Sequence, residues 1–150
     1  MGEVYYRKGK YAEAEKALAA ASLTLDDPGR FCNLRGIIAE NQGDFKKAEV
    51  FYLEAIAQLN ADAYFNHGFM LSKNFPDRLE DANISLYGGL KLSPNRPDVL
   101  NQIGVNMVHL NLLQLARICF AAALELAPDH AGYRRNLEFV NAKLSPELRK

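Results

Sequence analysis

The sequence has few of the features that mark membrane, secreted and nucleic-acid-binding proteins. Its 150 residues include 18 Lys and Arg and 18 Asp and Glu, so the basic excess typical of nucleic-acid binding is missing. The longest apolar runs, such as 17–23 and 118–124, fall far short of the roughly 20 residues that span a bilayer. No apolar signal-peptide core follows Met1. We therefore expect no nucleic acid as partner, no membrane insertion and, unless a longer parent chain carries its own signal, the cytoplasm by default.

Catalytic and metal-binding patterns are equally scarce. Cys32 and Cys119 stand 87 residues apart, which matches no metal or redox motif, and we expect two buried free thiols. His67, His109 and His130 match no zinc motif, and His67 is expected to be a packed structural histidine. Four carboxylates are expected to lie on helix surfaces and to be solvated: Glu13, Glu15, Glu49 and Glu54. The sequence thus predicts no catalytic residues, no metal site and no cofactor.

What the sequence does contain is a 34-residue repeat. Small residues recur at this interval in two series, Ala14, Ala48, Ala82 and Ala116, and then Ala21, Ala55, Gly89 and Ala123. Between them the residue is always large: Leu18, Tyr52, Leu86 and Phe120. Steps of four and three place all three positions on one stripe of a helix, so each copy contains a helix closely approached by a neighbour. A fixed period of this length indicates stacked supersecondary units.

A second helix precedes this one in each copy. Gly2, Gly36 and Gly104 stand twelve residues before the first small alanine, and a glycine inside a helix indicates close packing. In the third copy the interval to Gly68 is fourteen, which we interpret as two extra residues around 75–77; the rival register places Met70 at the small position. Breaks at 8–10, 41–44 and 110–111 join the two helices, and Pro94 and Pro128 follow the end of the second.

Two helices in 34 residues, with stretches such as Gly43-Asp44-Phe45-Lys46-Lys47-Ala48 and Ala122-Ala123-Leu124-Glu125-Leu126-Ala127-Pro128, resemble the tetratricopeptide repeat (TPR). The tryptophan often found early in that repeat is absent. The resemblance implies an all-α solenoid of antiparallel helix pairs wound into a right-handed superhelix. We expect one TPR domain over 1–150, with repeats at about 1–28, 29–60, 61–96 and 97–130, a C-terminal capping helix at about 131–143 and a tail at 144–150.

The two ends of the sequence suggest a piece of a longer array. The first copy has room for only about two turns of its first helix, at 2–8. After the capping helix, Ser145 and Pro146 have the types expected at the N-cap and first position of a new helix. We therefore expect a new helix to begin at 145.

In a TPR stack the first helix of each pair lines a concave groove, so residues near the small position of these helices should face it. The amides there can bond a peptide backbone, the apolar residues can receive side chains, and Arg135 can attract acid. The predicted peptide-binding groove consists of Asn33, Ile37, Asn66, Phe69, Asn101, Gln102, Val105, His109, Arg135, Asn136 and Phe139. Leu34, Ile37 and Val105 stand where a clamp for acidic chaperone C-termini would need polar residues, so we expect no such clamp.

The sequence therefore predicts a non-catalytic scaffold that binds a peptide or helix of a partner protein in this groove. Residues 131–150 carry a net charge of +3, which suits a partner with an acidic stretch. The alternative function is structural: the chain is a segment of a longer TPR superhelix that stacks, or self-associates, through its open ends.

Overall fold

The computed structural model describes residues 10–21 and 26–148, and this part contains helices and no strand. The helices are α2 (Tyr11–Ala21), α3 (Pro28–Asn41), α4 (Phe45–Ala57), α5 (Ala61–Asn74), the 3₁₀ helix η1 (Pro76–Arg78), α6 (Leu79–Leu92), α7 (Pro97–His109), α8 (Leu113–Leu126) and α9 (Ala131–Leu148). Within the described ranges, no helix has the length and apolar character to span a bilayer.

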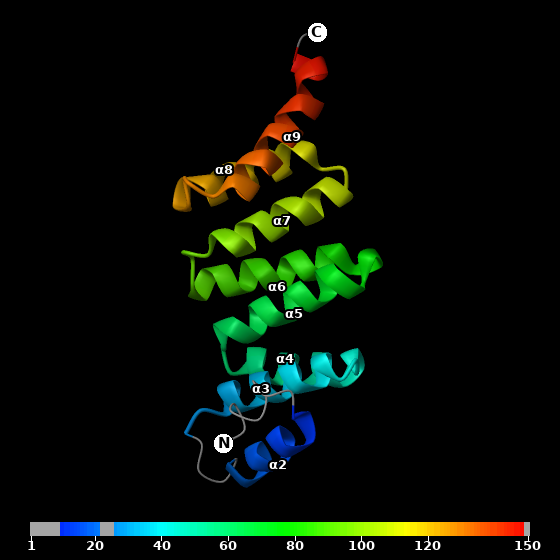
Figure 1. Cartoon of the computed structure of the whole chain (residues 1–150), viewed down its shortest axis with the longest axis vertical. Helices are drawn as coiled ribbons and strands as arrows, with labels where there is room; N and C mark the ends of the chain where they lie inside the picture. Colours follow the sequence, from blue (N-terminus) through cyan, green and yellow to red (C-terminus); the bar gives the residue numbers. More distant parts are fainter. Residues whose placement is uncertain (1–9, 22–25, 149–150) are drawn as a thin grey trace.

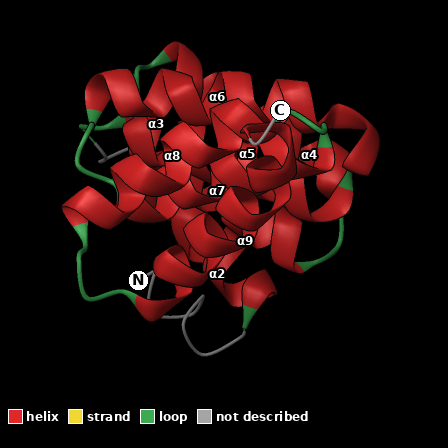
Figure 2. Ribbon diagram, turned by 90° about the horizontal axis from the view of Figure 1, so that it is seen from above, coloured by secondary structure: helices red, strands yellow, loops and turns green. Residues whose placement is uncertain are grey.

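The helices form antiparallel pairs that follow one another along the long axis of the molecule (Figure 1). The closest packing lies within the pairs α3–α4, α5–α6 and α7–α8, while α9 packs on α8. Successive first helices also touch, α3 with α5 and α5 with α7, and Figure 2 shows the stack from its end. The predicted all-α solenoid of antiparallel pairs is confirmed. The predicted first helix of copy one, at 2–8, lies outside the described residues.

The repeated small and large residues form the core as the spacing predicts. The four alanines of the first series are fully buried, and the large residues between the two series are buried as well. In the second and fourth repeats the large side chain lies against the glycine of its pair: a Cβ on Gly36 would come within 2.5 Å of the Tyr52 ring, and one on Gly104 within 2.5 Å of the Phe120 ring. Glycine is therefore required there because the helices approach too closely for any side chain.

The third repeat keeps the same packing despite its two extra residues. A Cβ on Gly68 would lie 2.5 Å from Leu86 Cγ, so Gly68 holds the small position and Met70, which is buried, belongs to the core. The extra residues form η1, close to the predicted 75–77. The rival register is thereby excluded, and the first helix of this repeat presents the face that we expected.

Helix ends follow local side-chain chemistry. Asp27, Asp44 and Asn60 cap α3, α4 and α5 by accepting hydrogen bonds from backbone N–H groups three residues ahead. Gly43 adopts φ +79° in the turn between α3 and α4, a conformation that glycine takes without strain. Pro94 and Pro128 follow the ends of α6 and α8, as predicted.

The prediction for the C-terminal end is wrong. α9 does not stop at 143; it continues to Leu148, through the expected start of a new helix. Ser145 Oγ donates a 2.8 Å hydrogen bond to the Asn141 carbonyl of the preceding turn, so Ser145 acts within the helix and not as an N-cap. The buried Leu144 packs in one cluster with Val140 and Phe120, and this packing outweighs the helix hydrogen bond that Pro146 cannot donate.

Candidate interaction groove

Seven of the eleven predicted groove residues line two pockets on the side where the first helices meet. The larger, of about 530 Å³, lies at the N-terminal ends of α3, α5 and α7 and is polar. It is lined by Asp27, Arg30, Asn33, Leu34, Ile37, Asn60, Asp62, Phe65, Asn66 and Arg96. The smaller, of about 160 Å³, lies between α7 and α9 and is mostly apolar. It is lined by Val105, Val108, His109, Phe120, Asn136 and Phe139.

The polar pocket has a fixed cation on one wall. The Arg96 guanidinium lies 4.3 Å from the centre of the Phe65 ring and is held by Asp98 through bonds of 2.7 and 2.9 Å. Hydrogen bonding to Asp98 raises the pKa of Arg96, and the same contact lowers the pKa of Asp98. Phe65 is buried beneath this cation and contributes to the core.

Four predicted amides are not independent binding groups, because they bond one another in pairs across neighbouring first helices. Asn66 Nδ2 donates to Asn33 Oδ1 over 3.0 Å, and Asn136 Nδ2 donates to Asn101 Oδ1 over 2.8 Å. The described α5 and α7 share no such pair, because the buried Phe65 stands on α5 at the position that Asn33 and Asn101 hold on their helices. Gln102, also predicted to face the groove, donates to Asn106 Oδ1 at 3.0 Å.

Each asparagine pair keeps hydrogen-bonding capacity for a ligand. The Asn33 amide nitrogen and the Asn66 amide oxygen have no partner in the described chain, and Asn101 and Asn136 repeat this arrangement. No buried polar side-chain atom of the described residues lacks a partner, so each unused group reaches solvent, although Asn33 as a whole is only 7% exposed. A pair thus offers one donor and one acceptor side by side, as a peptide unit does.

The apolar pocket contains most of the predicted residues of the C-terminal half. Val105, His109, Asn136 and Phe139 line it together, and Phe139 is 51% exposed. Lys143 Nζ lies 5.5 Å from the centre of the Phe139 ring. The pocket therefore combines an accessible aromatic face with an amide at its edge.

Four predicted residues line neither pocket: Asn101 and Gln102, which bond Asn136 and Asn106, and two others. Phe69 lines neither pocket, because it packs against the core cluster of Phe65 and Leu86. Arg135 is exposed and also lines neither pocket. Of the predicted cationic stretch, Arg134 is turned to its own backbone and donates to the Pro128 carbonyl at 2.8 Å. Arg149 and Lys150 lie outside the described residues.

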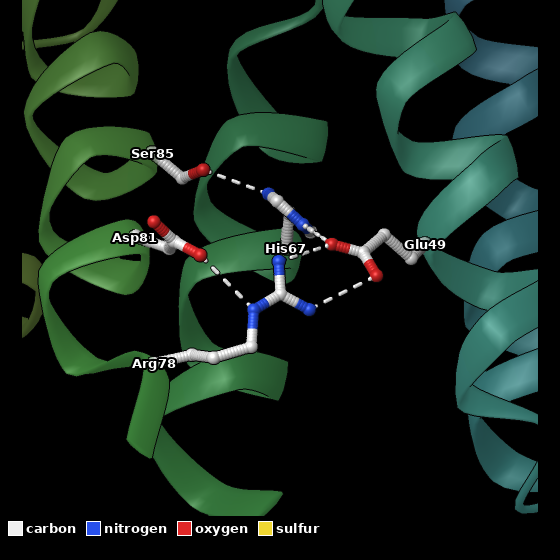
Figure 3. A network of polar contacts seen from close by, with 5 residues as sticks. All are labelled: Glu49, His67, Arg78, Asp81 and Ser85. Carbon is white, nitrogen blue, oxygen red and sulfur yellow. Dashed lines mark hydrogen bonds and ion pairs between the residues drawn. The ribbon is translucent and has the colours of Figure 1, made fainter. Parts of the chain in front are cut away.

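A charged network joins the second and third repeats, and sequence reasoning missed it (Figure 3). Arg78 donates to both oxygens of Glu49, at 2.7 and 3.1 Å, and to Asp81 at 3.0 Å. These hydrogen bonds from Arg78 are the main reason that the pKa of Glu49 falls from 4.5 to about 2. Glu49 was predicted to be a solvated carboxylate, and that prediction is wrong.

His67 is part of the same network, as the structural histidine that we predicted. Its Nε2 lies 3.1 Å from Glu49 Oε1 and donates, because a carboxylate only accepts, and its Nδ1 lies 2.7 Å from Ser85 Oγ. The role of Arg78 was not predicted, because Arg78 belongs to η1, an insertion that has no counterpart in the 34-residue period.

A neutral network joins the third and fourth repeats. Asn106 Nδ2 donates at 2.8 Å to both Ser72 Oγ and Asn83 Oδ1, and Ser72 Oγ donates to the Gly68 carbonyl. Asn106 is 1% exposed. One signal could have revealed it: the other copies have Ile38, Met70 and Val140 at this position, so a polar residue there needs a buried partner.

No group of three His, Cys, Asp or Glu side chains in residues 10–21 and 26–148 could hold a metal ion. The two cysteines are unpaired; Cys119 is buried as expected, whereas Cys32 is half-buried and lies 3.6 Å from Glu54 Oε2.

Comparison with known proteins supports the repeat. Residues 29–57 match the family model described as a tetratricopeptide repeat. No curated protein matches the chain. A chain of the APC/C hetero-tetramer Cut9–Hcn1 is similar in fold, with TM-score 0.74 and 21% identity over 93% of this chain, which spans only 28% of that chain's length.

Two further solved structures have the same fold. PilF of Pseudomonas aeruginosa superimposes with TM-score 0.82 and 20% identity, over 98% of this chain and 67% of its own. The first TPR of Spaghetti (RPAP3), solved with the HSP90 peptide SRMEEVD, gives TM-score 0.68 and 17% identity, over 81% of this chain and 97% of its own. The 34-residue period, the close glycine contacts and these likenesses agree: residues 29–57 match a tetratricopeptide repeat, and the described chain has the fold of TPR proteins.

Proposed function

We propose that the chain is a non-catalytic scaffold that binds a peptide or helix of a partner protein in the groove of its first helices. TPR folds generally serve as protein interaction scaffolds, and the TPR of Spaghetti holds a peptide in its solved structure. The observation that carries the proposal is the pair of matched amide sites, Asn33 with Asn66 and Asn101 with Asn136.

Each amide pair suits the backbone of a ligand. A peptide unit presents one C=O and one N–H, and each pair leaves an amide nitrogen and an amide oxygen free for them. Because the two asparagines already bond each other, their side chains are ordered before the ligand arrives, which lowers the entropy cost of binding. Backbone bonds of this kind hold a peptide without selecting its side chains.

Selectivity would come from the two pockets. The volume of about 160 Å³ between α7 and α9 suits one aliphatic side chain, packed against Phe139 and Val105. The polar pocket of about 530 Å³ has Arg96 and Arg30 with Asp27 and Asp62 along its walls, so it suits a polar or charged segment. We propose that an acidic stretch of the partner passes near Arg135, which is exposed beside the α9 end of the groove.

A carboxylate clamp of the chaperone-binding kind is not part of this proposal. Leu34 and Ile37 line the polar pocket where such a clamp would need polar groups. We expect the peptide SRMEEVD to show no saturable binding at micromolar concentrations, measured by fluorescence anisotropy. Stacking through the open ends remains the alternative function.

The experiment is a selection from a displayed random peptide library, repeated with groove variants. Asn101→Ala with Asn136→Ala, and separately Asn33→Ala with Asn66→Ala, should reduce the affinity of selected peptides by about tenfold, equivalent to losing one or two hydrogen bonds. Gln114→Ala, on the exposed side of α8, is the matched control and should bind normally. Unchanged affinity in both groove variants, with unchanged melting temperatures, would remove the groove from consideration.

A further inference from the structure

One position of the repeat carries a polar side chain that contacts the following repeat. It is the residue directly after the first small alanine of each second helix. The four residues at this position are Glu15, Glu49, Asn83 and Arg117.

The first three are bonded across the junction that follows them. Glu15 Oε1 accepts from Lys47 Nζ at 3.1 Å, Glu49 accepts from Arg78, and Asn83 Oδ1 accepts from Asn106. Three junctions thus use this position in the same way, with a partner supplied each time by the next helix pair.

Arg117, the fourth, has no such partner. It is exposed and forms no hydrogen bond or ion pair with the residues that the structure describes. It lines a pocket of about 530 Å³ between α8 and α9. The other lining residues are Ile118, Ala121, Ala122, Glu125, Leu137 and Asn141.

The equivalent places inside the stack are filled by the next second helix. His67 and Ile103 hold the position of Leu137 in the third and fourth repeats. His67 is buried under Ser85 of α6, and Ile103 clusters with Cys119 of α8. Leu137 itself is half-buried and Asn141 is exposed. The two covering residues hold the same repeat position and both are small, whereas the charged Arg35 at the equivalent place in α3 is covered by Phe51 of α4. Leu137 is apolar like Ile103, whose cover is Cys119, so a helix with a small residue at its closest approach fits this place.

The exposure of Ile118 does not distinguish this place from those inside the stack. Val50 and Ile84 hold its position in earlier repeats and are 54% and 71% exposed, against 60% for Ile118. This position therefore faces solvent inside the stack as well, and the place that the described residues leave unfilled is defined by Arg117, Leu137 and Asn141.

We propose that the pocket between α8 and α9 is a docking surface for an amphipathic helix of a partner protein, distinct from the groove of the first helices. The helix lies as a further second helix would, with a small residue against Leu137. A carboxylate near its N-terminal end pairs with Arg117. A cation near its C-terminal end pairs with Glu125, which lies about 12 Å further along α8 at 1.5 Å per residue.

The chain itself supplies two probes with opposite charge order. α6 has Glu80 and Asp81 in its first turn and Lys91 in its last, and Asp81 corresponds to Lys47, the residue that bonds Glu15. α4 has Lys46 and Lys47 in its first turn and Glu54 towards its end. Both are second helices of similar length. In every measurement the α4 peptide carries Phe51→Ser, which gives it the residue that α6 has at the closest approach, so the two peptides differ chiefly in charge order.

The experiment measures binding of synthetic peptides 79–92 and 45–57 to the intact chain by isothermal titration calorimetry. Each peptide is held helical by a lactam on its outer face, because isolated helices of this length are marginal. Peptide 79–92 should bind about tenfold more tightly than 45–57, since attraction at two ion pairs is replaced by repulsion. The double variant Arg117→Glu, Glu125→Lys should reverse this preference.

Two controls locate the site. Lys46→Glu, an exposed charge on α4, should leave the preference unchanged, and so should Asn136→Ala, which alters only the groove. Circular dichroism should show all variants folded. Equal binding of the two peptides, or a preference that the double variant does not reverse, would overturn the proposal. Arg117-dependent self-association of the unmodified chain in sedimentation velocity would also overturn it, in favour of a second copy as occupant.

Discussion

Glu49 joins the second repeat to the third through charges, whereas Asn106 joins the third to the fourth through neutral amides and a hydroxyl. The neutral network is also buried more deeply than the charged one. Side chains of Glu49 and Arg78 are 25% and 33% exposed, while Asn106 is 1% exposed. Burying a charge costs far more than burying a hydrogen-bonded amide, so the ion pair stays near water and the amide network occupies the interior.

The two networks should also differ in how strongly they hold their junctions and in how they respond to salt and pH. A partly solvated ion pair is screened by salt and responds to pH, whereas a buried amide network responds to neither but cannot lose a member without leaving unpaired groups. The junction around Asn106 should therefore be the stronger of the two, and the junction around Glu49 the one that solution conditions can weaken.

The largest effect is expected from Asn106→Ala. The substitution leaves Asn83 without its donor and opens a cavity between α5 and α7, and we expect a loss of about 2–4 kcal/mol in the free energy of unfolding. Urea denaturation at pH 7 measures it.

A double variant sharpens the same test. Asn83→Ala with Asn106→Leu removes both ends of the bond and places an apolar residue where other copies have Ile38, Met70 or Val140. Ser72 keeps the Gly68 carbonyl as its acceptor. Most of the lost stability should return, because no fully buried polar group is left unpaired, and the half-buried Gln102, which loses Asn106 Oδ1 as acceptor, can bond water. A double variant as unstable as Asn106→Ala would show that packing, not hydrogen bonding, sets the strength of this junction.

Glu49→Gln should have an intermediate effect that depends on pH. The pKa of Glu49 is about 2 in the folded chain against an ordinary 4.5, so its contribution is present above pH 4.5 and is lost as pH falls towards 2. We expect a loss of about 1 kcal/mol at pH 7, because the pair is partly exposed, and almost none near pH 2. Melting temperatures across this range, with Glu54→Gln on the exposed side of α4 as control, measure the difference. A constant difference between wild type and Glu49→Gln across the range would contradict the assignment.

These networks mark the limit of what the repeat can predict. Positions that the period aligns were predicted correctly: the small alanines, the closely packed Gly36 and Gly104, and the turns between helices. Gly68 was placed correctly only by allowing two extra residues in its repeat. Arg78 lies in an insertion that has no counterpart, so its bond to Glu49 could not be inferred from aligned positions.

The groove was predictable as a set of residues but not as a geometry. Asn33 stands three residues before its glycine and Asn66 two, so comparing one aligned position at a time hides the fact that they bond each other. The continuation of α9 past Ser145 was hidden for another reason. Ser and Pro favour a helix start locally, but the packing of Leu144 against the Phe120 cluster decides the outcome.

Lys47→Ala should have the smallest effect of the substitutions that break a junction. Lys47 Nζ bonds Glu15 at 3.1 Å, but the two side chains are 40% and 35% exposed, and exposed ion pairs stabilise a protein by roughly 0–1 kcal/mol. We expect a loss below about 0.5 kcal/mol that disappears in 1 M salt, where charges are screened within about 3 Å. Urea denaturation at low and high salt measures it beside Asn106→Ala, whose loss should persist in salt. If Lys47→Ala lowers the free energy of unfolding as much as Glu49→Gln does, solvent exposure does not determine the strength of the ionic junctions. The difference in strength between the Glu49 and Asn106 junctions would then have to come from the number of hydrogen bonds alone.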